Sequence, residues 1–177
     1  MYMNDNIQKT CGFYVSDFHL VTMLLPHIVT EIEKGTKIYA IMNKNITNEV
    51  KQVISRLNIN DIVKKKILNI NWNKTTNNDF NFIKYYMDEI TKEKIEIEII
   101  ITGSKAYIDT INRNIEYWMD TNKEKTKDAY VNLINCYEVA EYNSNINSIL
   151  NENNFLINTS GIKPVEEIFE ARKKKAV

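Results

Sequence analysis

The chain has 177 residues, of which 44% are apolar, and its 23 Lys and Arg residues balance its 23 Asp and Glu residues. This length and apolar content suit one domain with a buried core. The zero net charge excludes a global field that would attract nucleic acid or an anionic membrane. No apolar run reaches the ~18 residues that a membrane span requires, and the first residues lack a signal-peptide pattern. We therefore expect a single-domain cytoplasmic protein without membrane contact.

Neither the cysteines nor the histidines suggest a metal site or a disulfide framework. Cys11 and Cys136 fall in apolar, strand-like segments, where a free cysteine behaves as a small hydrophobic residue. His19 and His27 are eight residues apart, which places them roughly 80° apart around a helix axis. Neither histidine belongs to a His-Glu-x-x-His pattern. We expect no metal ion and no cofactor.

A strand is predicted at residues 11–15 and a helix from Ser16 to Gly35. Ser16 is a typical N-cap residue, and Gly35 can end the helix in the left-handed conformation. Pro26 removes a backbone donor inside this helix and should bend it. The apolar residues between the two ends recur at helical spacing. They are Val21, Leu24, Leu25, Ile28 and Ile32.

Further strands alternate with helices along the rest of the chain. Strands are predicted at residues 37–42, 67–72, 94–102, 129–136 and 155–158. The pattern at 94–102 is the clearest, because β-branched residues dominate it and Glu96 and Glu98 alternate with apolar residues, which predicts one wet face. Helices are predicted after Thr47 as a cap, around residues 59–66, at 80–90, at 108–119, at 139–149 and from Pro164.

This alternation predicts an α/β fold, a three-layer sandwich with a mainly parallel central sheet. We expect a flexible N-terminus at residues 1–10, one α/β domain at 11–162, and a C-terminal helix and basic tail at 163–177. The charged segment 121–128 is interpreted as a mobile loop within this domain. The only dense basic run, residues 172–175, is typical of a solvated helix end.

The candidate ligand site lies beyond the carboxyl ends of the strands, where parallel α/β sheets bind their ligands. The candidate ligand-binding residues are Tyr14, Ser16, Asp17, Asn43, Trp72, Thr102, Ser104, Lys105, Tyr137 and Glu138. Helix capping and turn formation explain polar residues in such loops equally well. Core packing is the simpler interpretation of Phe13 and Phe18. Trp72 and Tyr137 each precede a polar residue at a strand end and are candidates for a pocket wall.

The same segments give little support to catalysis. A phosphate loop needs clustered glycines and a lysine, which residues 13–19 lack, and Asp17 at a helix N-terminus would repel an anion. Ser16, Asp17 and His19 are residue types of a hydrolytic triad, but no nucleophile elbow accompanies them. The segment from Thr102 to Lys105 has small residues, a helix start and a lysine that could hold a phosphate or carboxylate. An ordinary turn with a solvated lysine explains it as well.

The order of several short motifs resembles the MEDS domain, a sensory domain named for methanogens, methylotrophs and the DcmR regulator and related to RecA/KaiC-type ATPases. The motifs are Phe13-Tyr14-x-x-Asp17-x-x-Leu20 with Leu25-Pro26, Gly35 before a strand, Ile70-Asn-Trp72, Thr102-Gly-Ser, Asn135-Cys-Tyr-Glu138 and Asn154-Phe-Leu-Ile-Asn. They span residues 11–162. Many members carry a histidine near the first strand, where this chain has Thr10-Cys11-Gly12. The resemblance implies a sensory module that binds a small ligand or partner and lacks a phosphate loop.

We therefore predict a non-catalytic cytoplasmic sensory or ligand-binding domain in signalling or transcriptional regulation. Its output passes to a protein partner or through the C-terminal helix. One alternative is a nucleotide-binding protein or enzyme that uses Thr102 to Lys105 with Asp17 or Glu138. Another is a protein-interaction module without a ligand, for which a homodimer remains open. Nucleic-acid binding is expected only through the C-terminal basic tail.

Overall fold

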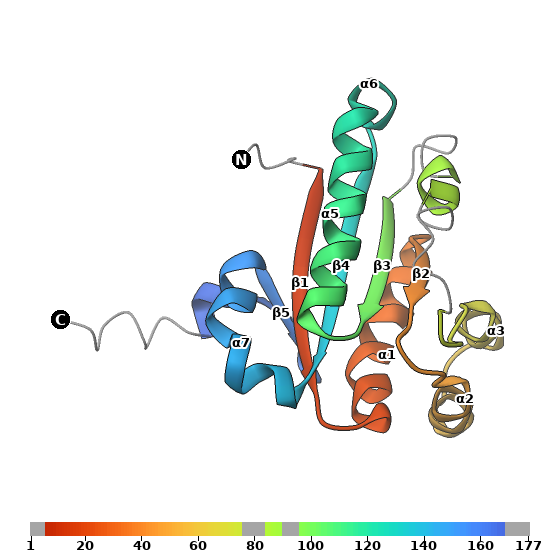
Figure 1. Cartoon of the computed structure of the whole chain (residues 1–177). Coiled ribbons are helices and arrows are strands. Elements are labelled where there is room, and N and C mark those ends of the chain that lie inside the picture. The colour runs from red at the N-terminus through yellow and green to blue at the C-terminus, as the bar shows by residue number, and fades with distance from the viewer. Residues whose placement is uncertain (1–5, 76–83, 90–95, 169–177) are drawn as a thin grey trace.

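The computed structural model describes residues 6–75, 84–89 and 96–168. At its centre is a six-stranded sheet with the order β2-β3-β4-β1-β5-β6 (Figure 1). The strands are β1 Ile7–Tyr14, β2 Lys37–Ile41, β3 Glu96–Thr102, β4 Tyr130–Glu138, β5 Phe155–Asn158 and β6 Gly161–Pro164. Neighbouring strands from β2 to β5 pair in parallel, and only β6 runs antiparallel to its neighbour. The predicted fold class is confirmed.

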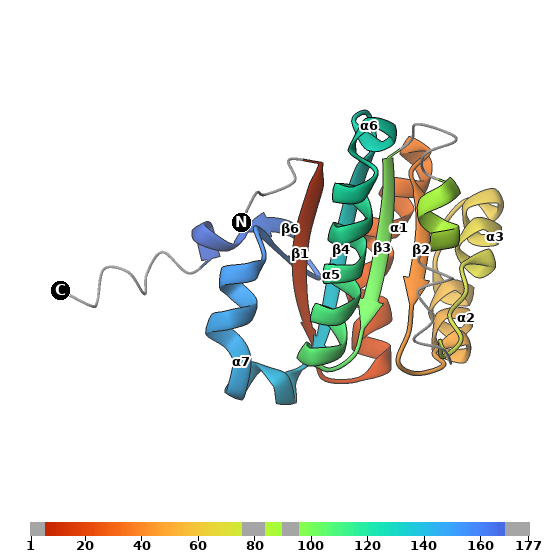
Figure 2. The ribbon, with the colours of Figure 1, turned by 45° about the horizontal axis from the view of Figure 1, so that its top comes forward.

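Helices cover both faces of this sheet, so the architecture has three layers (Figure 2). They are α1 Asp17–Lys34, α2 Thr47–Arg56, α3 Asp61–Asn69, α5 Lys105–Thr121, α6 Lys123–Thr126 and α7 Val139–Glu152. Residues 84–89 are also helical. Buried side chains of α1, α2 and α3 share one core with the sheet, and those of α5 and α7 share the other.

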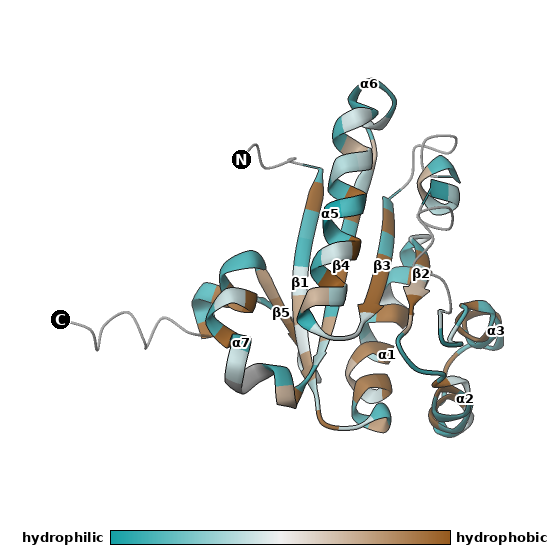
Figure 3. Cartoon of the chain, in the orientation of Figure 1, coloured by the Kyte–Doolittle hydropathy of each residue, from teal (hydrophilic) through white to brown (hydrophobic). Residues whose placement is uncertain are grey.

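Alternate residues of the central strands supply the two cores. Ile97, Ile99 and Ile101 of β3 pack toward α5, whereas Ile100 packs toward α1. This division follows from the period of two along a strand. The brown colouring of the arrowhead half of β3 in Figure 3 reflects burial on both faces, which is typical of central parallel strands. Full burial of each isoleucine contributes roughly 1.5–3 kcal/mol.

Helix α1 begins and ends as the sequence predicts. The Ser16 Oγ accepts a hydrogen bond from the His19 backbone N–H at 3.2 Å and thereby caps the helix. Gly35 follows the last turn with a φ of 93°, and its N–H bonds to the carbonyls of Glu31 and Ile32. The apolar stripe between these ends is buried against the sheet. The two caps therefore set the ends of α1, and the apolar stripe sets the face that packs on the sheet.

The predicted strand at residues 67–72 is wrong, because this segment is the last turn of α3 followed by a loop. The Asn60 side chain accepts a hydrogen bond from Ile62 N–H at 2.7 Å and starts the helix. Val63 and Ile67, four residues apart, are its buried positions. The short helix predicted around 59–66 thus continues to Asn69. Its apolar spacing near the end imitates the alternation of a strand.

Several predicted boundaries also change near the ends of the domain. Strand β1 starts at Ile7, inside the segment predicted as a flexible N-terminus. Residues 161–164 form β6, which pairs with β5, and a helical turn follows only at 165–168, where a helix from Pro164 was expected. The short strand predicted at residues 155–158 is confirmed as β5. The basic run at 172–175 lies outside the described residues.

The middle of the chain shows three smaller differences. Thr47 is the first residue of α2 and not its cap, since Ile46 holds the cap position without a side-chain hydrogen bond. The segment predicted as a mobile loop at 121–128 contains α6, and the Thr126 side chain is buried there. Met87 is buried as expected in the helical residues 84–89, whereas residues 80–83 and 90 of that predicted helix lie outside the described residues.

Among the described residues, no helix combines the length and the apolar character needed to cross a bilayer.

A buried ion pair joins α1 to β3, where the sequence predicted a wet strand face. The Glu98 side chain is only 1% exposed. Its Oε2 lies 2.6 Å from His27 Nε2 and accepts a hydrogen bond from Asn132 Nδ2 at 2.9 Å. Helix α1 covers this part of β3, and His27 compensates the buried carboxylate. Glu96, two residues earlier on the same strand face, is exposed as predicted.

We expect this ion pair to make stability depend on pH. Burial lowers the pKa of His27, but the hydrogen bond to Glu98 and the charge of Glu98 outweigh it, so the pKa rises above 6.5. The stabilisation is therefore complete below pH 6.5 and is lost as the pH rises through the higher pKa of the folded state. Urea unfolding at a series of pH values from 6.5 upward should give a free energy of unfolding that falls with pH. This fall should be smaller in His27→Gln. An identical decline in the variant would contradict the assignment.

Candidate functional site

The carboxyl ends of β1, β2, β3 and β4 lie along one edge of the sheet, at the bottom of Figure 1. The neighbouring strands β1 and β4 send the chain to opposite faces at this edge. Helix α1 follows β1 and packs in one core, whereas α7 follows β4 and packs in the other. In open α/β sheets, ligands usually bind beyond the strand ends at the point of such a reversal.

Three charged residues, Asp17, Lys44 and Glu138, meet at this junction and form what we call the edge triad. Lys44 Nζ lies 2.5 Å from Glu138 Oε1 and 3.5 Å from Asp17 Oδ1. Asp17 is the first residue of α1, Glu138 the last of β4, and Lys44 follows β2. Their side chains are 34–46% exposed, so a molecule from solvent can reach all three. The hydrogen bond to Glu138 raises the pKa of Lys44, which stays protonated.

Polar groups beneath the edge triad are already hydrogen-bonded to one another. Thr102 Oγ1 donates to Asn43 Oδ1 at 2.7 Å and accepts from the Asn43 backbone N–H at 3.0 Å. The Tyr14 side chain is buried and stands opposite Glu138 in the β1–β4 register. Burial, followed by the negative charge of Glu138, raises the pKa of Tyr14, so its hydroxyl stays neutral. These residues give the site a polar, uncharged floor.

Exposed apolar side chains lie within two residues of Asp17 or Glu138 in the sequence. Val15 is 72% exposed, Phe18 is 44% exposed and Val139 is 40% exposed. Phe18 therefore differs from the expectation of core packing, because the first turn of α1 projects past the end of the sheet. A molecule that covers these side chains would gain hydrophobic burial in addition to polar contacts.

The connection from β1 to α1 is too short to surround phosphates. Only Val15 and Ser16 separate the last residue of β1 from the first residue of α1. The Val15 N–H donates to His19 Nδ1, and the His19 N–H donates to Ser16 Oγ. A phosphate loop instead offers several free amides from a longer glycine-rich segment. Ser16 acts here as a helix cap.

The Thr102 to Lys105 turn is built as a helix start whose charges are already paired. Gly103 has a φ of 156°, and an added Cβ would lie 2.7 Å from the Tyr107 ring. The Ser104 Oγ caps α5 by accepting from the Tyr107 N–H. These contacts explain the small residues of the turn without a ligand.

Lys105 does not join the edge triad. Its Nζ contacts Asp109 at 2.6 Å and Glu152 at 2.9 Å, on α5 and α7. Burial lowers the pKa of Lys105, but these two carboxylates outweigh it and raise the pKa. The Lys105 backbone N–H faces the Glu141 carboxylate at 3.4 Å. An anion at this helix start would have to displace these carboxylates.

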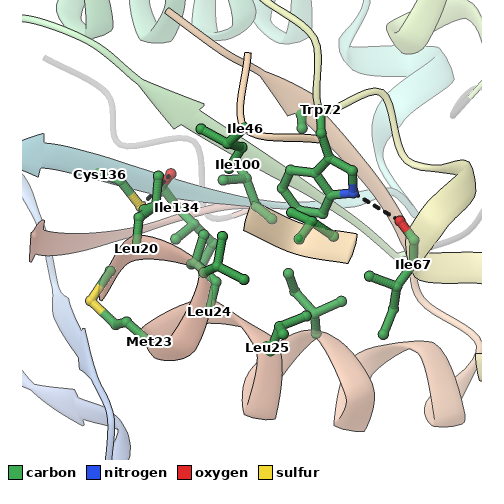
Figure 4. Close-up of a cluster of buried hydrophobic side chains, with 14 of the residues drawn as sticks. Leu20, Met23, Leu24, Leu25, Ile46, Ile67, Trp72, Ile100, Ile134 and Cys136 are labelled. Carbon is green, nitrogen blue, oxygen red and sulfur yellow. Dashed lines mark hydrogen bonds between the residues drawn. The ribbon is translucent and has the colours of Figure 1, made fainter. Parts of the chain in front are cut away.

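Trp72 and Tyr137, the candidates for a pocket wall, are both buried in the core. Trp72 is 3% exposed, and its indole N–H donates to the Ile67 carbonyl at 2.8 Å (Figure 4). The apolar space beside its ring is too small for a water molecule. Tyr137 is fully buried in the opposite core, 5.9 Å from the Phe13 ring. Both aromatic rings pack between the helices and the sheet, so neither is accessible to a ligand from solvent.

The structure thus brings together Asp17, Glu138, Asn43, Thr102 and Tyr14, and it adds Lys44. The sequence signal for Lys44 was its place in the polar segment that follows the second strand. Because Asp17 and Glu138 were both predicted at this sheet edge, charge pairing alone favoured Lys44 as the cation between them.

The two cysteine thiols and the possible metal ligands can be assessed in the described part of the chain. Burial raises the pKa of Cys11 to about 12, and Cys136 is buried with a pKa raised by the same cause. Neither thiol is therefore an activated nucleophile. Within the described ranges, no three His, Cys, Asp or Glu side chains are arranged to hold a metal ion.

Comparison with known proteins gives no family assignment. No protein-family model matches the chain, and no curated protein matches it. The resemblance to the MEDS domain therefore stays a prediction, and the chemistry of the edge triad is the main guide to function.

Proposed function

We propose that the chain is a non-catalytic cytoplasmic sensory domain, which binds a small molecule at the edge triad and acts through a protein partner in signalling or transcriptional regulation. The observation that carries this proposal is the position of Lys44, which pairs with both Asp17 and Glu138. Through these contacts, Lys44 connects the first turn of α1 to the start of α7 at the β1–β4 junction. This junction is the position where open α/β sheets bind ligands.

The groups around the edge triad favour a ligand with polar edges and a flat or apolar body. Two carboxylates against one ammonium leave a local charge that disfavours a triphosphate. Lys44 can donate to an acceptor of the ligand, and Asp17 and Glu138 can accept from its donors. The exposed side chains of Val15 and Phe18 offer apolar contact for a ring or sugar face. Nucleosides, carbohydrates and aromatic metabolites have these features.

Signal transmission follows from the weakness of exposed ion pairs. Pairs of this kind contribute ~0–1 kcal/mol each, so a ligand can replace them at little cost. Glu138 is the N-cap residue of α7, and α7 leads directly into β5 and β6. A ligand that replaces the Lys44–Glu138 contact therefore changes what holds the first turn of α7. If the ligand binds more tightly when α7 takes one of two positions, it increases the population of that position. This change alters the surface that α7 presents to a partner.

Ligand screening of matched variants tests this proposal. Thermal-shift and calorimetric screens would use nucleosides, carbohydrates and aromatic metabolites, with ATP and GTP as comparison compounds. We expect a compound of the first three classes to raise the melting temperature by ~5–10 °C when present at a hundred times its Kd. Lys44→Met should abolish this shift. Lys123→Met, which removes an exposed lysine of α6 that pairs with Asp120 of α5, should retain it.

Three results would contradict the proposal. The first is a ligand that binds wild type and Lys44→Met equally. The second is binding of ATP that Lys105→Ala abolishes, which would favour the nucleotide-binding alternative. The third is a screen without a stabilising compound together with a protein partner that docks on another face, which would favour the interaction module.

A further inference from the structure

A second polar site lies on the α1 face of the sheet, near the amino ends of the strands. Gln8, Asn132 and Glu98 form one row across β1, β4 and β3. This row is six residues before the row of Tyr14 and Glu138 on the same strands, which corresponds to ~20 Å. The site is therefore separate from the edge triad.

Two acceptor atoms of this row are buried without a hydrogen-bond partner among the described residues. Glu98 Oε2 receives both available donors, His27 Nε2 and Asn132 Nδ2. Glu98 Oε1 and Asn132 Oδ1 receive none. Unpaired buried acceptors are rare in native proteins because they lose their hydrogen bonds to water without compensation. Glu98 and Asn132 are paired residues of β3 and β4, so a molecule with several donors would complete both acceptors.

An open groove of about 530 Å³ lies over this row. Its walls are the second half of α1 and the turn between β5 and β6, and its lining includes His27, Glu31, Glu96, Asn132, Thr159 and Ser160. Glu98 faces the same side of β3 as Glu96 and contacts two of the lining residues, His27 and Asn132. Glu98 itself lies directly behind the lining, whereas Asn132, which carries the other unpartnered acceptor, is part of the lining. The groove volume falls within the usual range of small-molecule sites.

The charges around the groove favour a cation. Lys34 is engaged with Glu31 at 2.7 Å, and the second oxygen of Glu31 accepts from Thr36. His27 faces Glu98, and Lys34 is the cation whose charge also acts on the exposed Glu96. Three carboxylates, those of Glu31, Glu96 and Glu98, therefore stand against two cationic side chains, those of His27 and Lys34, at the groove. A ligand with several N–H donors and a positive charge satisfies both the hydrogen-bond deficit and the charge.

We propose that this groove binds a small organic cation through an ammonium or guanidinium group. Glu98 Oε1 and Asn132 Oδ1 are the buried acceptors, and Glu96 adds charge at the rim. The site adds a second ligand to the proposed function and does not depend on the edge triad.

Calorimetry with matched probes tests this site on the full chain. Putrescine presents ammonium groups, agmatine adds a guanidinium, and 1,4-butanediol is the uncharged counterpart of putrescine. We expect at least one of the two cations to bind with a Kd below ~1 mM, and the diol not to bind. Glu98→Gln keeps the shape of the floor and should weaken binding by about tenfold or more, because a charged hydrogen bond is lost. Glu49→Gln on α2 should leave the affinity unchanged.

A second variant keeps the test decisive if Glu98→Gln fails to fold. Glu96→Gln changes an exposed rim residue and should weaken cation binding by about threefold while the protein stays folded. Hydrogen exchange should show protection by the cation at residues 26–34 and 159–162. The proposal is overturned if neither cation binds, if the diol binds equally, or if the folded variants keep the wild-type affinity, since water alone would then complete the floor.

Discussion

Replacing Trp72 by alanine is expected to lower the free energy of unfolding by about 3–5 kcal/mol. The indole ring is 3% exposed and packs among Leu25, Ile46 and Ile67 between α1, α3 and the sheet (Figure 4). Its removal would leave a cavity that the surrounding helices can close only in part. The hydrogen bond from the indole N–H to the Ile67 carbonyl is lost as well. Urea unfolding followed by circular dichroism measures the change.

Two further variants separate packing from other effects at this position. Trp72→Phe keeps most of the packing and loses the hydrogen bond, so we expect a smaller loss of ~1–2 kcal/mol. Tyr117→Ala removes an aromatic ring that is 67% exposed and should change stability by less than ~0.5 kcal/mol. If Trp72→Ala were as stable as wild type, the ring would not be a core residue, and the pocket-wall prediction would regain support.

The elements with a local signal in the sequence could be predicted well. Helix α1 has a serine cap, a glycine stop and an apolar stripe, and all three act as predicted. Strand β3 is rich in β-branched residues and is buried on both faces. In such segments, local propensity and tertiary packing favour the same conformation, so the sequence pattern is sufficient.

The errors arose where a short pattern fits two conformations. Residues 67–72 alternate apolar and polar side chains, yet Asn60 starts a helix whose buried positions include Ile67. The choice depends on the core formed with α1, which no local pattern describes. Glu98 similarly alternates like a wet-face residue, but α1 covers it and supplies His27 from 71 residues away. Long-range partners of this kind cannot be inferred from spacing along one strand.

The candidate site shows the same limit. Asp17 and Glu138 could be placed at one edge because parallel strands share the direction of their carboxyl ends. Trp72 was assigned to that edge through a strand that does not exist. Tyr137 belongs to a correctly predicted strand. Its side chain is nevertheless buried in the core shared with α5 and α7, because successive side chains of a strand point to opposite faces of the sheet. Placing a residue at the carboxyl edge of the sheet thus required only that its strand be identified correctly. Placing its side chain in a pocket wall required in addition the face of the sheet to which that side chain points.

Breaking the buried ion pair from one side should be more damaging than removing it entirely. His27→Leu leaves the Glu98 carboxylate buried with only Asn132 as a donor, and we expect a loss of about 3–5 kcal/mol. Adding Glu98→Leu removes the uncompensated charge and fills the space with apolar atoms. The double variant should therefore recover most of the loss, within ~1–2 kcal/mol of wild type.

A double-mutant cycle measures this coupling directly, and the exposed pair of Lys123 and Asp120 provides the matched control. The cycle at His27 and Glu98 should give a coupling energy of several kcal/mol, whereas the exposed pair should give less than ~1 kcal/mol. Additive losses at His27 and Glu98 would mean that each side chain acts through separate packing. Strong coupling would mean that charge compensation holds α1 on β3.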